Sequence, residues 1–261
     1  MAESVEASFT FEKRETPTEE QLAASQRAAM GVGASVVHFL GCKKHKDDPI
    51  LIQIASQAFF ALYLRWIAKS WIIGDKTYDR FLDTVYGRIR DAEAQAISGR
   101  WRALTRAHIQ QAQHDEAQRI ASLVNAIVSG LADILLAAGC SAPVEELREA
   151  LKKRFNEKIA VMVELAMRIN RVIGEDVTSG NLEVVAISSA APFDKATMED
   201  AYEDGRADLK ASDNNRVLCP TDLGLRRLTR ISTIGQSQWE EKLLLRPKVA
   251  LESVVDNVDD W

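Results

Sequence analysis

The sequence has few of the features that would identify a particular chemistry. Its three cysteines, Cys42, Cys140 and Cys219, lie far apart and include no CxxC pair. An odd number of distant cysteines indicates reduced thiols rather than a disulfide framework. The chain also lacks a P-loop, GxGxxG, HExxH and GxSxG. These absences exclude the enzyme classes that the motifs mark, so we expect no cofactor and favour a protein without enzymatic activity.

The chain also lacks an excess of positive charge. Its formal net charge is −5, and no segment concentrates lysine and arginine into a broad basic face. We therefore expect no binding to nucleic acid and none to anionic lipid. Residues 1–20 are polar and acidic, without the apolar region of a secretory signal, which predicts a cytoplasmic protein with the nucleus as the alternative.

The most apolar stretch is residues 50–73, which is long enough to cross a bilayer. It is interrupted by polar and charged residues that fall on one helical side, Gln53, Gln57, Arg65 and Lys69. This arrangement is typical of a core helix with one solvent-exposed side. The sequence therefore predicts no stable membrane insertion.

Apolar residues spaced by three and four predict five long helices between residues 16 and 175. The first begins at Thr16-Pro17-Thr18-Glu19, where Thr16 is the expected cap and Glu19 its partner, and runs to about residue 41. The others cover residues 49–74, 75–96, 101–138 and 143–173; for the stretch 101–138 we expect either a protruding half or a break near 111–115. The predicted fold is all-α, an antiparallel helical bundle with an irregular C-terminal arm.

The remaining segments predict four parts of the chain. Residues 1–15 lack apolar periodicity and are expected to be flexible. The helical bundle spans 16–175, and an acidic linker spans 176–215, with a short extended segment at 181–187 and one short helix at 193–204. Residues 216–261 form the C-terminal arm, in which short apolar runs alternate with turn-forming residues.

His38, Cys42 and His45 follow one another at spacings of four and three. On a continuous helix they would present two imidazoles and a thiolate on one side, which suits zinc or a similar metal. The alternative is a frayed basic helix end, because Lys43, Lys44 and Lys46 lie among them and no fourth ligand is evident.

A second candidate set lies in the polar stretch of residues 106–119. His108, His114, Asp115 and Glu116 are of the types used in acid–base chemistry and metal binding. The gap of six residues places the two histidines on different helical faces, so a solvated helix surface explains the composition equally well.

The C-terminal arm carries a possible modification site. Arg226-Arg227-Leu228-Thr229 matches the pattern of basophilic kinases, and Arg230-Ile231-Ser232 adds a second hydroxyl beside an arginine. Phosphorylation of Thr229 or Ser232 would invert the local charge. Short patterns of this kind also arise by chance.

The end of the arm has the composition of a docking segment. It combines an aromatic residue, a leucine run and a terminal tryptophan, represented by Trp239, Leu243, Leu244 and Trp261. Such residues anchor a chain in the groove of a partner. Alternatively, residues 243–255 fold back and cover the bundle.

We interpret the chain as a non-enzymatic helical-bundle protein that interacts with another protein or with itself, through a regulated arm. One alternative is a helical enzyme or small-molecule binder with an aromatic pocket between helices, lined by Phe59, Tyr63, Trp66, Trp71 and Met162. The other is a membrane-active bundle in which the second helix becomes exposed.

Overall fold

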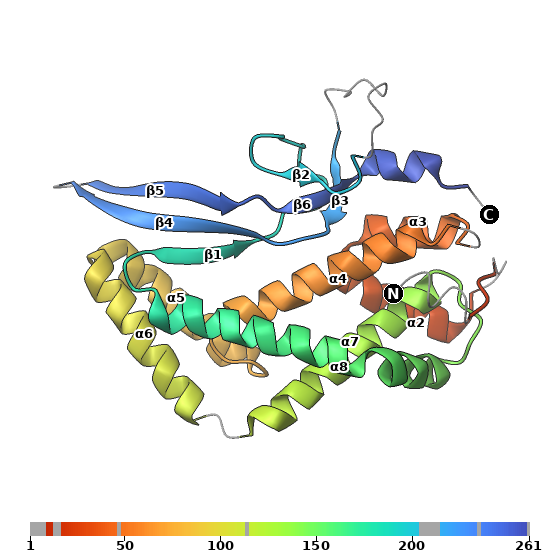
Figure 1. The fold of residues 1–261 in the computed structure, drawn as a ribbon, viewed down its shortest axis with the longest axis horizontal. Coiled ribbons are helices and arrows are strands. Elements are labelled where there is room, and N and C mark those ends of the chain that lie inside the picture. Colours follow the sequence, from red (N-terminus) through yellow and green to blue (C-terminus); the bar gives the residue numbers. More distant parts are fainter. Residues whose placement is uncertain are drawn as a thin grey trace.

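A computed structural model describes residues 9–12, 17–45, 48–112, 115–203, 215–233 and 236–259. These residues form seven α-helices and six strands, so the all-α prediction is wrong. The helices form one layer, and two small sheets lie together on one side of it (Figure 1). The C-terminal third of the chain supplies most of the strands, where the sequence analysis expected an irregular arm.

The first predicted helix is two helices. α2 (Glu19–Val32) and α3 (Ala34–Cys42) meet at Gly33, whose φ of +98° favours glycine and interrupts the helix. The capping box is formed by Thr18 and Gln21, not by Thr16 and Glu19: the Gln21 amide donates to Thr18 Oγ1 at 3.2 Å, and the Thr18 amide donates to Gln21 Oε1 at 3.0 Å. The cap is therefore one half-turn later than predicted.

The following helices are shorter and more numerous than predicted. Residues 49–112 hold three elements: α4 (Ile50–Lys69), α5 (Lys76–Ala92), capped by Asp75, and α6 (Gln95–Ala112). α7 (Glu116–Ala137) begins after Asp115, so the break expected near 111–115 is confirmed. α8 (Val144–Arg171) continues into a π-helical turn, η1 (Val172–Asp176).

Two three-stranded sheets complete the fold. In the first, β1 (Asn181–Val185), β4 (Gly224–Thr233) and β5 (Gln236–Leu245) are antiparallel, in the order β1-β4-β5. In the second, β6 (Lys248–Leu251) lies between β2 (Glu199–Asp200), to which it is parallel, and β3 (Val217–Pro220), to which it is antiparallel. A 3₁₀ helix, η2 (Glu252–Asn257), follows. The extended segment at 181–187 is confirmed as β1, whereas the short helix expected at 193–204 is replaced by turns and β2.

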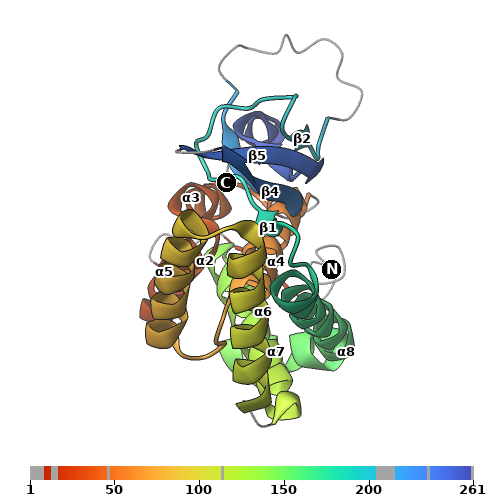
Figure 2. The ribbon, with the colours of Figure 1, turned by 90° about the vertical axis from the view of Figure 1, so that its left-hand side faces the viewer.

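The hydrophobic core joins the helices to the C-terminal strands. Its fully buried side chains include Leu40, Ile54, Ile127, Ile134 and Leu147 from the helices, and the same cluster contains Leu218, Cys219, Ala250 and Val255. Viewed from the end at which α5 and α6 lie, the sheets cover one side of the helical layer (Figure 2). Much of the C-terminal arm therefore packs on its own helices.

Among the described residues, α4 and α7 are each long and apolar enough to cross a membrane by length and composition. Both contribute to the buried core of the protein, where apolar helices of this kind are expected. The predictions of no stable membrane insertion and of a cytoplasmic location remain predictions.

Helices α4 and α7 approach closely at Gly130. An added Cβ at Gly130 would lie 2.1 Å from Cζ of the buried Phe59 ring, whereas one at Gly41 in α3 would meet nothing within 4 Å. Gly130→Ala should therefore lower the free energy of unfolding by about 1–3 kcal/mol through overpacking. Gly41→Ala should raise it by about 0.5–1 kcal/mol through helix propensity. Urea titration followed by circular dichroism measures both values, and a stabilising Gly130→Ala would contradict this close packing.

Candidate functional site

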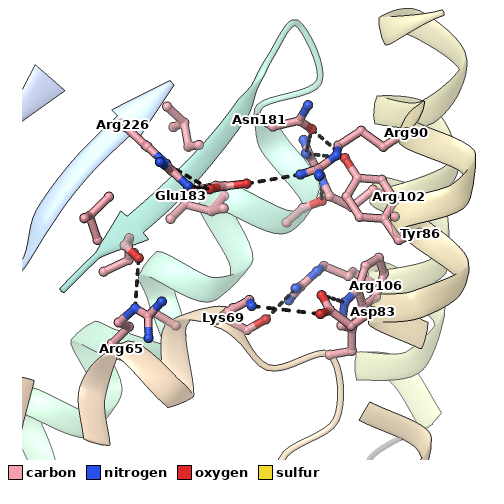
Figure 3. A pocket seen from close by; sticks show the side chains of 18 of the residues that line it. Arg65, Lys69, Asp83, Tyr86, Arg90, Arg102, Arg106, Asn181, Glu183 and Arg226 are labelled. Atoms are coloured by element: carbon pink, nitrogen blue, oxygen red, sulfur yellow. Dashed lines mark hydrogen bonds and ion pairs between the residues drawn. The ribbon is translucent and has the colours of Figure 1, made fainter. Parts of the chain in front are cut away.

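The strongest candidate site is a cavity of about 490 Å³ between the helices and the first sheet (Figure 3). Its walls come from α4, α5, α6, the η1 turn, β1 and β4. The lining includes six cationic side chains, Arg65, Lys69, Arg90, Arg102, Arg106 and Arg226. Of the described residues, two carboxylates line the same space, Asp83 and Glu183, which leaves an excess of four positive charges.

Arg102 holds the end of η1 and the start of β1 in place. Its side chain is buried, and its guanidinium donates to the Tyr86 hydroxyl at 2.9 Å and to Asn181 Oδ1 at 2.6 Å. It also donates to backbone carbonyls of the segment that links α8 to β1, those of Gly174, Val177 and Gly180. One side chain of α6 thereby satisfies acceptors that the end of a helix leaves open.

Arg106, one turn further along α6, binds the end of α4. Its guanidinium donates to the carbonyls of Ser70 and Lys69, both at 2.9 Å, and to Asn170 Oδ1 at 3.1 Å. It also lies over the Trp71 ring, 4.4 Å from the centroid. Carbonyls at a helix C-terminus carry partial negative charge and so stabilise this buried cation.

Burial strongly affects the charge of Arg106. Desolvation, together with the neighbouring Arg102, lowers the pKa of Arg106 to about 10, although the Asp79 and Asp83 carboxylates oppose this change. Within the described part of the chain, no carboxylate forms an ion pair with the Arg106 guanidinium. An anion bound in the cavity would therefore reduce the electrostatic cost of burying Arg106.

Glu183 of β1 neutralises one side of the cavity. Its carboxylate accepts hydrogen bonds from Arg226 at 2.7 and 3.0 Å and from Arg90 at 3.1 Å. The hydrogen bonds that Arg226 donates to Glu183 raise the pKa of Arg226, and Glu241 of β5 forms a further ion pair with the same arginine at 3.2 Å. These pairs connect β1 with α5 and β4 through Glu183, and β4 with β5 through Arg226.

Arg65 and Lys69, on α4, keep most of their donors available at the opposite side of the cavity. Arg65 donates from Nε to the Val184 carbonyl at 3.1 Å, and Lys69 Nζ lies 3.9 Å from Asp83 Oδ2. Figure 3 shows both side chains on the side opposite Glu183 and Arg226. Their remaining N–H groups are suited to hydrogen bonds with an anion.

The predicted metal ligands do not converge. Cys42 Sγ and His38 Nε2 lie 3.9 Å apart on α3. His45 lies beyond the helix, fully buried, where its Nε2 donates to the Leu40 carbonyl at 2.7 Å and burial lowers its pKa. Among the residues that the structure describes, no group of three His, Cys, Asp or Glu side chains is arranged to hold a metal.

The polar set of the sequence analysis is also spread out. His108 is exposed on α6, and His114 lies outside the described residues. Asp115 caps α7, because its Oδ1 accepts from the Gln118 amide at 2.9 Å, and Glu116 is in the first turn of the same helix. The structure thus gives Asp115 a capping role.

The predicted modification and docking residues lie on the β4–β5 hairpin. Thr229 and Ser232 are in β4, opposite Glu240 and Ser237 of β5, where an irregular arm was predicted. Trp239, Leu243 and Leu244 are in β5, and Trp261 lies outside the described residues. Phosphorylation and docking at these positions stay predictions.

The predicted aromatic pocket is divided between two places. Trp71 lines the basic cavity, whereas Tyr63 and Trp66 line a separate hollow between α4 and the start of α7. Phe59 is buried in the core, and Met162 lines neither of these spaces. The sequence analysis missed Arg102 and Arg106, although their spacing of four places both on one face of α6, which is the signal that could have identified them.

Comparison with known proteins adds no assignment, because no family model, no curated protein and no solved structure matches the chain.

Replacing Arg102 tests its structural role. Arg102→Ala would leave several buried carbonyls without a donor, so the free energy of unfolding should fall by about 3–5 kcal/mol. The matched control is Arg100→Ala on the same helix, where the side chain is exposed and the change should stay within about 0.5 kcal/mol. Thermal and urea unfolding measure both, and equal effects of the two substitutions would contradict the role assigned to Arg102.

The three thiols should differ in reactivity. Cys42 is exposed, whereas Cys140 and Cys219 are buried, and burial raises the pKa of Cys219 to about 12. Since the thiolate is the reactive species, iodoacetamide at pH 8 should alkylate Cys42 in the folded protein and Cys219 only after unfolding. Peptide mapping by mass spectrometry identifies the modified residue. Rapid labelling of Cys219 in the native protein would contradict its burial.

Proposed function

We propose that this protein binds a compact, multiply charged anion, of the kind presented by a phosphate-bearing small molecule, in the basic cavity. The observation that carries the proposal is the excess of four positive charges among the side chains of one cavity, in a chain whose net charge is −5. Grouping like charges costs electrostatic free energy, which a bound anion offsets. The volume of about 490 Å³ is in the range usual for small-molecule sites.

The contacts already made inside the cavity favour one side of it for the anion. Arg90 and Arg226 already form ion pairs with Glu183, and Arg102 already donates hydrogen bonds to backbone carbonyls. The available donors are therefore those of Arg65 and Lys69, with the positive field of Arg106 beside them. A ligand phosphate at this side of the cavity would make charge-assisted hydrogen bonds to the two α4 side chains.

The aromatic side chains at the cavity favour a ligand without a nucleobase. Trp71 and Tyr86 line the cavity, but Arg106 lies over the Trp71 ring, and Arg102 lies over the Tyr86 ring at 5.7 Å. Tyr86 also stacks on Trp101, with the two rings 8° from parallel. Since these faces already have neighbours, an additional base would gain little stacking, and polyphosphates such as pyrophosphate or inositol phosphates suit the site better.

Anion binding agrees with the earlier interpretation of a regulatory protein without enzymatic activity. The ligand would interact with α4, and the same cavity contains residues of α5, β1 and β4. It would therefore stabilise the contact between the helices and the hairpin that carries Trp239, Leu243 and Leu244. We retain interaction with a partner protein in the cytoplasm as part of the proposal.

Calorimetric titration tests the proposal directly. Pyrophosphate and inositol hexakisphosphate should bind the full chain at low salt, and the affinity should fall as salt is raised, because salt screens charge. Arg65→Gln and Lys69→Gln should each weaken binding by about tenfold, since each removes a charge-assisted hydrogen bond. Tryptophan fluorescence gives a second readout, because Trp71 lines the cavity.

The matched control for these variants is Lys152→Gln, which removes one exposed positive charge from α8. It should leave the affinity nearly unchanged. If neither anion binds at millimolar concentration, or if Lys152→Gln weakens binding as much as Lys69→Gln, the cavity is not the anion site.

A further inference from the structure

Strand β5 is an edge strand with an open side. In the sheet order β1-β4-β5 nine of its ten residues pair with β4, and no other strand within the described part of the chain pairs with it. About half of its backbone N–H and C=O groups point toward that open side. Figure 1 shows the β4–β5 hairpin above α5 and α6, at one end of the helical layer. A long open edge of this kind is a template for pairing with another strand.

The charges along β5 favour one partner, a second copy of the same strand. Glu240 and Lys242 are exposed and lie on one face of β5, because alternate residues of a strand share a face. If two β5 strands pair antiparallel about Glu241, Glu240 of each copy lies opposite Lys242 of the other. Both cross-strand pairs then have opposite charges, which stabilises the pairing.

The hairpin itself makes this arrangement favourable for Lys242. Within one chain, Lys242 lies opposite Arg227 of β4, so its cross-strand neighbour is another cation. A carboxylate on the open side offsets that repulsion. At the centre the two Glu241 side chains would face each other, but each already forms an ion pair with its own Arg226 at 3.2 Å.

The other face of the strand provides apolar contacts in the same register. Trp239 of each copy lies opposite Leu243 of the other. Trp239 is half-buried under Arg90, whose guanidinium lies 5.3 Å from the ring centroid. Aromatic–aliphatic pairs across a ladder add to its stability. The register shift in the β4–β5 ladder at Leu244 limits regular pairing beyond this point.

From these observations we infer that the protein forms a symmetric dimer in which two β5 edges pair antiparallel about Glu241, joining the two β1-β4-β5 sheets into one. The pairing uses exposed charges and backbone groups of the hairpin, and it does not depend on occupation of the basic cavity.

Charge reversal tests both the dimer and its register. Sedimentation velocity of the full chain should show a dimer that dissociates on dilution. Glu240→Lys and Lys242→Glu should each weaken dimerisation by about tenfold, because each replaces two attractive cross-strand pairs by repulsive ones. The double variant, and an equimolar mixture of the two single variants, should both restore association, since opposite charges then face each other again.

Two controls separate pairing from folding. Lys242→Glu replaces a cation opposite Arg227 by a carboxylate, which favours the hairpin. Weaker dimerisation by this variant therefore does not arise from a weakened hairpin. Glu149→Lys and Lys152→Glu make the same charge changes at exposed positions of α8 and should leave the dimer intact. A wild-type chain that is monomeric at every soluble concentration, or a dimer that the β5 reversals do not weaken, would overturn the inference.

Discussion

The structure depends on two buried guanidinium groups of α6 that bind backbone carbonyls of other elements. Arg106 binds the last carbonyls of α4, and Arg102 binds those of the turn that leads from α8 into β1. A buried cation without acceptors would be costly, and a buried carbonyl without a donor would be costly too. The buried guanidinium groups and the buried carbonyls therefore offset each other's desolvation cost. The hydrogen bonds between them determine where the first sheet begins.

The same hydrogen bonds to backbone carbonyls explain why the site is basic. Carbonyls stabilise Arg102 and Arg106 without neutralising their charge, so the cavity keeps the field of two guanidinium groups beside Arg65 and Lys69. Glu183 compensates on one side, where it pairs with Arg90 and Arg226. The resulting asymmetry, with one neutralised side and one cationic side, is the basis for proposing a polyanionic ligand.

Ion pairs also connect the cavity to the outer hairpin. Glu183 pairs with Arg226 of β4, and Arg226 pairs with Glu241 of β5, the residue about which we infer that two chains pair. Arg90 contacts both Glu183 and the Trp239 ring. The basic cavity and the hairpin therefore share side chains, although anion binding and dimerisation are inferred from different observations.

Local signals made several elements predictable. The break between α6 and α7 follows from a polar stretch beside Asp115, and β1 follows from its short apolar run. The hairpin was not predicted, because β4 and β5 mix charged, polar and apolar residues without the regular alternation that marks a half-buried strand. The strand character of β4 and β5 becomes evident only when each supplies the other with backbone hydrogen bonds.

The sequence by itself determined that residues 16–175 are largely helical, because apolar periodicity is a local property of the chain. Only the tertiary structure decided where the positive charge gathers. The cationic residues of the cavity come from α4, α5, α6 and β4, separated by up to 161 positions between Arg65 and Arg226, and no local pattern records such a distance. A net charge of −5 conceals this site because an average over the chain carries no information about position.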